Sequence, residues 1–360
     1  MLAERIEAGD FPSAVYVVAE RASVVLADAL GDAVKEKEQH AATLDTIYDL
    51  ASLTKPLITG LLCALRLERS EIKLDEAVAH YLPEFETNDK RDITIRHLLT
   101  HTSGLPAWRP LYLTGSSDRE RVLQAIAGEA LEQKPGTHVL YSDLGFISLG
   151  FLLERLSNAQ LTEIARREIF EPLKLQRTFF NPDKTLITEM AASEMGNVYE
   201  CETCGGQQAD SYSWRENLIW GEVHDGNAHF LGGAAGHAGL FSSARETLRI
   251  ATQFFADCTE LLKPETCALF RTNLTEGMEE ARSVGWQLAA TPGSTASTSL
   301  PPDSFGHLGF TGTSCWNDPT HTRTFILLTN RTHARPLPFV NINNVRRQFH
   351  QLAVASLNRN

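Results

Sequence analysis

The sequence lacks the features of a nucleic-acid-binding or membrane-spanning chain. Lys and Arg total 33 against 45 Asp and Glu, the formal net charge is -12, and no run of five or six basic residues occurs. Such a basic patch is what would offset phosphate charge, so nucleic acid is not an expected partner. The longest apolar stretch, "PLITGLLCAL", has about half of the roughly 20 residues that a membrane-spanning helix needs.

The N-terminal stretch "MLAERIEAGDFPSAV" lacks the basic segment followed by an apolar one that marks a secretory leader. A cytoplasmic location is therefore expected, whereas a leader removed before this start would place the protein in the periplasm. The oligomeric state is left open, because no stretch of the sequence bears on it.

Cysteine is too scarce for a disulfide framework, since six residues stand in a chain of 360 and several lie inside apolar or helical patterns. They are Cys63, Cys201, Cys204, Cys258, Cys267 and Cys315. The pair in "CETC" at 201–204 has the spacing of half a zinc site, which His224, His229 or His237 would have to complete. A single half-motif is weak evidence, so packing as small core residues is favoured, and no metal or cofactor is expected.

The composition is that of a soluble globular enzyme or binding protein, with 42% hydrophobic and 22% charged residues. A chain of 360 residues exceeds the usual size of one simple domain. Two domains, or one large unit with an inserted lobe, are therefore expected.

The hydrophobic pattern places strands at the two ends of the sequence and helices between them. Two short strands are predicted at about 14–19 and 22–28, joined by a turn, and leucine spacing after Thr46 predicts one helix of about five turns. Residues 92–234 hold mostly helical segments and loops. Strand patterns return in "GLFSSA", "VGWQLAA", "FGHLGFTGTSCWND" and "TRTFILLTNR", the last two predicted as neighbours joined by "NDPTH". This order predicts an α+β fold whose sheet is built from both chain ends around an inserted helical lobe.

Two stretches match S-x-x-K, and their positions distinguish them. Ser70 and Lys73 lie where the predicted helix ends in charged residues, which indicates a solvated turn, whereas Ser52 and Lys55 lie at its start. Residues three apart share one helix face, and the first N–H groups of a helix have no partner within it. Ser52 activated by Lys55 would therefore be a nucleophile beside oxyanion donors. Taken alone, however, the stretch favours the other interpretation, in which the serine caps the helix and the lysine is exposed to solvent.

Two further motifs change this balance. "YSD" at 141–143 precedes an apolar helix, and "HLG" at 307–309 lies on a predicted edge strand. The triplet resembles the S-x-x-K, Y-x-N and K-T-G or H-x-G motifs of the serine β-lactamase and penicillin-binding-protein superfamily, in the branch of class C β-lactamases, family VIII esterases, D-aminopeptidases and DD-peptidases. The stretches "ITIRHLLTHTSGLP" and "GEVHDGNAHFLGGAAGHAGLFSSA" are similar to this branch in the same order.

The resemblance implies a fold and a division of the chain. It implies a mainly antiparallel sheet flanked by helices beside a mostly helical lobe, with the active site between them. The chain is expected to form one catalytic unit, with an α/β lobe at about 1–60 and 235–360 and a helical lobe at about 61–234.

The resemblance also implies roles for single residues. Ser52 would become acylated, while Lys55 and Tyr141 would move its proton. The backbone N–H groups of Ser52 and of Phe310, which follows Gly309, would form the oxyanion hole. His307 would line the opposite wall, and His101 would pack below the site.

Two departures from the family pattern bear on the substrate. Asp143 stands where the β-lactamases carry Asn, and His307 stands where they carry Lys, so both make the motif positions less positive. A substrate carboxylate is therefore not favoured, because His is mostly neutral at pH 7. Asp143 should also keep Lys55 protonated, which would move the role of base to Tyr141.

The expected function is a metal-independent serine hydrolase, foremost a carboxylesterase that acts on small esters. A β-lactamase, a DD-peptidase or a D-aminopeptidase is the alternative within the superfamily, so the expected partner is a small ester or amide. An alternative of another class is a non-catalytic binding or structural protein that keeps the pocket. The presence of Ser52, Lys55 and Tyr141 together speaks against it.

Overall fold

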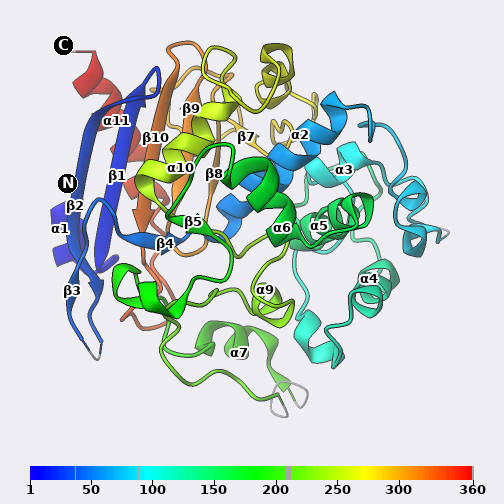
Figure 1. Cartoon of the computed structure of the whole chain (residues 1–360), viewed down its shortest axis with the longest axis horizontal. Coiled ribbons are helices and arrows are strands. Elements are labelled where there is room, and N and C mark those ends of the chain that lie inside the picture. Colours follow the sequence, from blue (N-terminus) through cyan, green and yellow to red (C-terminus); the bar gives the residue numbers. More distant parts are fainter. Residues whose placement is uncertain (37, 88, 207–211, 359–360) are drawn as a thin grey trace.

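The computed structural model covers the whole chain and describes residues 1–36, 38–87, 89–206 and 212–358. The described residues form a seven-stranded antiparallel sheet in the order β3-β2-β1-β10-β9-β8-β7 (Figure 1). Its strands are β1 Ser13–Glu20, β2 Ser23–Val34, β3 His40–Ala41, β7 Gln287–Leu288, β8 Phe305–Leu308, β9 Ser314–Asp318 and β10 Arg323–Thr329. A small second sheet has the order β4-β6-β5, with β4 Ile47–Asp49, β5 Thr178–Phe179 and β6 Phe241–Ser243.

The sheet is built from both ends of the chain, as the sequence predicts. β1 pairs along its length with β10, from Ala14 opposite Thr329 to Glu20 opposite Arg323. Successive side chains of a strand point to opposite faces. Accordingly Val15 and Val17 belong to one buried cluster, while Ala14 and Val18 belong to another.

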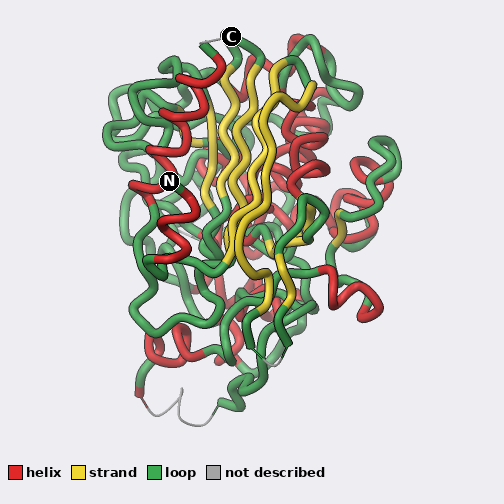
Figure 2. The backbone as a smooth tube through the Cα atoms, turned by 90° about the vertical axis from the view of Figure 1, so that its left-hand side faces the viewer, coloured by secondary structure: helices red, strands yellow, loops and turns green. Residues whose placement is uncertain are grey.

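Helices cover both faces of the sheet (Figure 2). The helices α1 Leu2–Glu7 and α11 Asn343–Leu357 pack on the Ala14 face through apolar residues such as Phe349. The other face is covered by α10 Ala244–Ala251, which contacts β1 and β10. The other α-helices of the described residues are α2 Leu61–Glu68, α3 Ile95–Leu99, α4 Arg119–Gly128, α5 Asp143–Ser157, α6 Leu161–Ala165, α7 Val198–Cys204 and α9 Gly226–Phe230.

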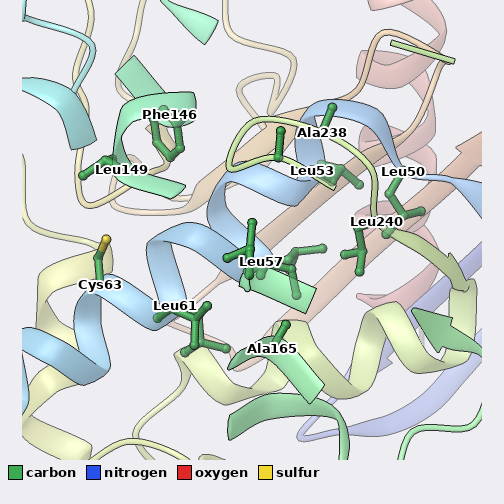
Figure 3. Close-up of a cluster of buried hydrophobic side chains, with 14 of the residues drawn as sticks. Leu50, Leu53, Leu57, Leu61, Cys63, Phe146, Leu149, Ala165, Ala238 and Leu240 are labelled. Carbon is green, nitrogen blue, oxygen red and sulfur yellow. The ribbon is translucent and has the colours of Figure 1, made fainter. Parts of the chain in front are cut away.

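The helical region joins the sheet through one large apolar cluster. Leu53, Leu57 and Leu61 lie on the stripe that the sequence predicts, and they share the cluster with Phe146 of α5 and Leu240 (Figure 3). All five side chains are fully buried. Burying a leucine side chain contributes about 2 kcal/mol, so this stripe anchors the segment that carries Ser52 and Lys55.

The helix predicted after Thr46 begins later in the structure than the sequence predicts, and its first turns are not α-helical. Residues Ile47–Asp49 form β4, which pairs with β6, a partner nearly 200 positions away that local periodicity cannot reveal. The helical part begins as a 3₁₀ turn at Ala51–Leu53, widens to a π turn at Lys55–Gly60 and ends as α2. The leucine stripe survives this change because the whole segment stays helical and buried.

The stretch "FGHLGFTGTSCWND" forms two strands, β8 and β9, which pair through His307 opposite Cys315. β9 then pairs with β10, as predicted for neighbours joined at 319–322. β8 is the penultimate strand, but β7 covers only Phe305 and Gly306. Within the described residues, no helix has the length and apolar character needed to cross a bilayer.

Candidate active site

Ser52 follows a turn that several side chains hold in place. Ala51 has φ of +48°, a left-handed conformation that is uncommon for a residue with a side chain. Asp49 compensates by accepting the Ala51 N–H through Oδ1 at 2.8 Å, and Thr313 donates through Oγ1 to the carbonyl of Leu50 at 2.9 Å. Strained residues of this kind persist where the surroundings over-determine them, and they gather at functional sites. The turn therefore presents Ser52 in a fixed direction.

Lys55 is fully buried and holds three groups through one ammonium. Its Nζ donates to Ser52 Oγ at 3.0 Å and to the carbonyl of His237 at 3.1 Å, and it lies 2.7 Å from Asp143 Oδ1. Burial opposes the charge, but Asp143 and Tyr141 outweigh it and raise the pKa of Lys55. The contact between Ser52 and Lys55 that the sequence predicts is present, and Lys55 is in the protonated form.

Tyr141 reaches the same place from the turn before α5. Burial raises the pKa of its hydroxyl, although Lys55 and a hydrogen bond with Ser52 work in the opposite direction. Its ring stacks on His101, with centroids 4.4 Å apart. His101 accepts the backbone N–H of Ser142 through Nδ1 at 3.0 Å, and burial holds its pKa well below its usual range. His101 thus fixes Tyr141 from below as a neutral, structural side chain.

His307 lies beside Tyr141, with ring centroids 5.9 Å apart, but it is buried and does not line the cavity above Ser52. Its Nδ1 donates to the carbonyl of Leu308 at 2.9 Å. Burial and the charge of Lys55 hold its pKa well below its usual range, so the ring is neutral at pH 7. The wall that faces Ser52 is made instead by the residues that follow it, Leu308, Gly309 and Phe310.

Gly309 brings this wall against the turn of the nucleophile. Its N–H donates to the carbonyl of Thr313 at 2.8 Å. A Cβ on Gly309 would lie 2.0 Å from Thr313 Oγ1 and 2.6 Å from the carbonyl oxygen of Leu50. The absence of a side chain therefore lets the end of β8 contact the backbone just before Ser52.

Replacement of Gly309 by alanine is expected to lower kcat at least about 10-fold and the free energy of unfolding by about 1–3 kcal/mol, because backbone atoms must move to admit the methyl group. Steady-state kinetics and urea unfolding measure both. Gly128→Ala on the exposed end of α4, where an added Cβ meets nothing within 4 Å, is the matched control. A Gly309→Ala variant with the kcat of the wild type would show that the wall can shift without consequence.

A cavity of about 660 Å³ opens above Ser52. Its acidic side chains are Asp143, Glu200 and Asp225, and its basic ones are Arg331 and Arg346. Aromatic side chains complete the lining, namely Trp108, Tyr141, Tyr199, Phe310 and Phe339. The cavity therefore offers apolar walls, both signs of charge and one serine in contact with a lysine, which together suit acyl transfer to and from a small substrate.

The two arginines were not found by sequence reasoning. Arg346 of α11 donates to the carbonyls of Gly309 and Thr313, both at 2.9 Å, and burial lowers its pKa to about 9. Arg331 donates to the carbonyl of Phe310 at 2.6 Å. Among the ion pairs of the described residues, none includes Arg331 or Arg346. The charge count at the motif positions alone therefore understates the positive charge of this cavity.

The zinc interpretation of "CETC" is not supported. All six cysteines are free. Within the part of the chain that the structure describes, no group of three potential metal-ligating side chains that includes Cys201 or Cys204 converges. Cys204 instead lies 3.4 Å from the hydroxyl of Tyr112, and His224 binds Glu194 at 2.8 Å.

Comparison with known proteins agrees with this geometry. The family model described as Beta-lactamase matches residues 1–347. The chain is 30% identical over 367 aligned positions to a protein of Escherichia coli (strain K12) named "Putative D-alanyl-D-alanine carboxypeptidase", with 92% of this chain and 81% of the relative covered.

Solved structures share the fold. "EstCE1, a hydrolase with promiscuous acyltransferase activity" matches with a TM-score of 0.73 at 22% identity, covering 96% of this chain and 95% of that one. A class C beta lactamase matches with a TM-score of 0.74 at 16% identity, covering 98% and 95%. The predicted α+β fold, an antiparallel sheet with helices on its faces, is thereby confirmed.

Proposed function

The chain belongs to the beta-lactamase family and is a serine hydrolase, and from that premise we propose that it is a carboxylesterase that cleaves small esters through an acyl-enzyme on Ser52. The ion pair between Lys55 and Asp143 carries the proposal. A lysine held as an ammonium has no free electron pair, so it can take the proton of Ser52 only while it passes one of its own protons to Asp143, and Ser52 is therefore only modestly activated. An ester has a more electrophilic carbonyl and a better leaving group than an amide, which suits such a serine.

The proton of Ser52 can leave along a short chain of contacts. As Ser52 Oγ bonds to the carbonyl carbon, its proton passes to Lys55 over 3.0 Å, while Lys55 gives one of its own protons to Asp143 over 2.7 Å. The substrate carbonyl oxygen becomes the oxyanion, and Asp143 becomes neutral. When the intermediate collapses, the same proton returns through Lys55 to the departing alkoxide, and water repeats the sequence to release the acid.

Two neighbouring groups assist this proton transfer. Tyr141 keeps its proton, since burial raises its pKa, so we assign it hydrogen bonding to Ser52 and the leaving group rather than the role of base that the sequence suggested. The backbone N–H groups of Ser52 and Phe310 are proposed to bind the oxyanion, a contact that is worth about 100- to 1000-fold in rate per donor. Gly309 makes that second donor available by letting β8 approach.

A substrate panel tests the proposal. We expect p-nitrophenyl butyrate to be turned over faster than nitrocefin or a D-alanyl-D-alanine peptide, each measured at several concentrations to give kcat/KM. A nitrocefin kcat/KM equal to that for the ester would reverse this order. Mass spectrometry after fluorophosphonate treatment separates an enzyme from a binding protein, because only an active Ser52 gains an adduct.

A second candidate, cleavage of a peptide with a terminal carboxylate, is favoured by the arginines of the cavity. Arg331 and Arg346 have no acidic partner among the described residues, and a carboxylate is the group that a guanidinium binds best. The name of the Escherichia coli relative points in the same direction. Release of D-alanine from the peptide at a higher kcat/KM than ester hydrolysis would place this activity first.

A further inference from the structure

Asp225 and His237 form a second pair beside the Lys55 ammonium. His237 Nε2 donates to Asp225 Oδ1 at 2.9 Å, and the carbonyl of His237 accepts from Lys55 at 3.1 Å. One oxygen of Asp143, one of Asp225 and a ring nitrogen of His237 all lie within 4.8 Å of one another. Lys55 thus lies among two carboxylates and an imidazole, whereas the motifs predict only Ser52, Tyr141 and Asp143 beside it.

The turn that carries His237 is fixed by its glycines. A Cβ on Gly236 would lie 2.0 Å from the carbonyl oxygen of Phe146, and Thr59 donates to the carbonyl of Gly236 at 2.7 Å. The turn at 236–239 is therefore packed between α5 and the π turn that carries Lys55. Its position leaves little freedom for the carbonyl of His237, which sets the place of the ammonium.

Asp225 is fixed independently of His237. Its Oδ1 also accepts the N–H of Ala228 at 2.8 Å and caps α9. Burial alone would raise its pKa, but His237, the Ala228 N–H and Lys55 together hold the pKa well below its usual range. Asp225 therefore stays a carboxylate, and with Asp143 and Lys55 it gives the group a formal charge of about -1.

That charge matters for the proton transfer. A group that carries one excess negative charge accepts the proton of Ser52 more readily than a neutral ion pair does, because the product is then neutral. With Asp143 as the only carboxylate, the same transfer would leave an uncompensated ammonium. Asp225 supplies this additional negative charge through its position beside Lys55, and no direct role toward Ser52 is needed.

We propose that Asp225 and His237 are positioning residues of the hydrolysis, in which His237 holds the Lys55 ammonium and Asp225, while the charge of Asp225 lets the Lys55–Asp143 pair accept the proton of Ser52. The inference rests on the acyl-enzyme mechanism proposed above. It assigns a function to the "HD" and "GHAG" segments, which the motif triplet does not include.

Other titratable groups lie around this cluster, and a variant of Asp225 retains all of them. Burial and Asp225 both raise the pKa of Asp49 and of Glu200, while burial lowers the pKa of the nearby imidazoles His101 and His307. Among the described residues, the titratable and charged groups that interact with the cluster or with its immediate neighbours include Asp49, His101, Tyr141, Glu200, His224, Arg282 and His307. A difference between the two pH profiles therefore reports the charge of Asp225 and its effect on these neighbours.

Asp225→Asn tests the inference, because an asparagine keeps an oxygen for Ala228 and for His237 but has no charge. We expect the acid limb of kcat/KM for p-nitrophenyl butyrate to move about one unit to lower pH and the plateau to fall about 10-fold, with KM unchanged. The rate of fluorophosphonate labelling of Ser52 should show the same shift. Asp118→Asn, at the exposed N-terminus of α4, is the matched control and should keep the wild-type profile.

Variants of His237 separate anchoring from folding. His237→Gln keeps a donor for Asp225 and should recover most of the activity that His237→Leu loses. An Asp225→Asn variant with the wild-type limb and plateau would overturn the inference and leave the proposed function intact. So would a uniform loss at every pH together with a lower Tm, since that is the result of a purely structural role. A wild-type protein that neither hydrolyses the ester nor reacts with fluorophosphonate would instead overturn the proposed function itself, and this inference with it.

Discussion

Replacement of Ser52 by alanine is expected to reduce kcat for p-nitrophenyl butyrate by about 10⁵-fold. The alanine removes the only atom that the proposed mechanism acylates, while Lys55, Asp143 and the wall at Gly309 remain to bind substrate. Loss of a nucleophile from such a group costs nearly as much as loss of the whole group, because its members act as a unit. Burst kinetics and intact-protein mass spectrometry give the measurement.

The chain supplies its own control for this substitution. Ser70 is the serine of the second S-x-x-K match, is exposed and has φ of +58°. Glycine adopts this φ readily, so Ser70→Gly removes the second serine without straining the backbone. It should retain wild-type kcat and wild-type labelling. A Ser52→Ala protein that keeps even a tenth of the wild-type kcat would place the nucleophile elsewhere.

Replacement of Lys55 by methionine is expected to reduce kcat by about 10³-fold, within the range for loss of a group that transfers protons. It should also lower the free energy of unfolding by about 3–5 kcal/mol, since Asp143 and Asp225 then lie close together without the buried cation beside them. Kinetics and urea unfolding at several pH values measure both effects. Lys73→Met, at the exposed second match, is the control.

The loss of stability in Lys55→Met depends on pH, and its sign follows from Lys55 itself. Burial opposes the charge of Lys55, but Asp143 and Tyr141 outweigh it and raise the pKa of Lys55 in the folded wild type. Stability from a raised pKa is fully present below the unfolded value, which is about 10 for lysine, and is lost as the pH rises through the folded pKa. The difference in stability between wild type and variant should therefore be constant from pH 5 to pH 8 and become smaller only above about pH 10, and a difference that grows between pH 5 and pH 8 would contradict this account.

The parts of the fold that local patterns specify were predictable. The predominance of β-branched and apolar residues predicted the hairpin that forms β1 and β2, and the leucine stripe through Leu57 predicted the buried helical segment. The start of that segment was not predictable, because β4 forms only by pairing with β6 far along the chain. Long-range pairing leaves little trace in three residues of sequence.

The site shows the same division. The motif triplet placed Ser52, Lys55, Tyr141 and Asp143 together, since their spacing and order carry the signal. Arg346 came from a helix that the triplet does not include. The sequence did contain a pattern that could have revealed Arg346. This arginine lies on the face of α11 that also carries Phe349 and Ala353, and an arginine within an apolar face is expected to be buried and paired with polar groups.

The pairing of β1 with β10 also determines when the site can form during synthesis. Ser52 and Lys55 leave the ribosome about 250 residues before β8, which is roughly 10 to 50 s of translation at about 5–20 residues per second. β8 reaches its place only through β9 and β10, and β10 completes the sheet against the first strand of the chain. A nascent chain therefore carries its serine and lysine without the wall that faces them, and the site is incomplete until β10 has been synthesised.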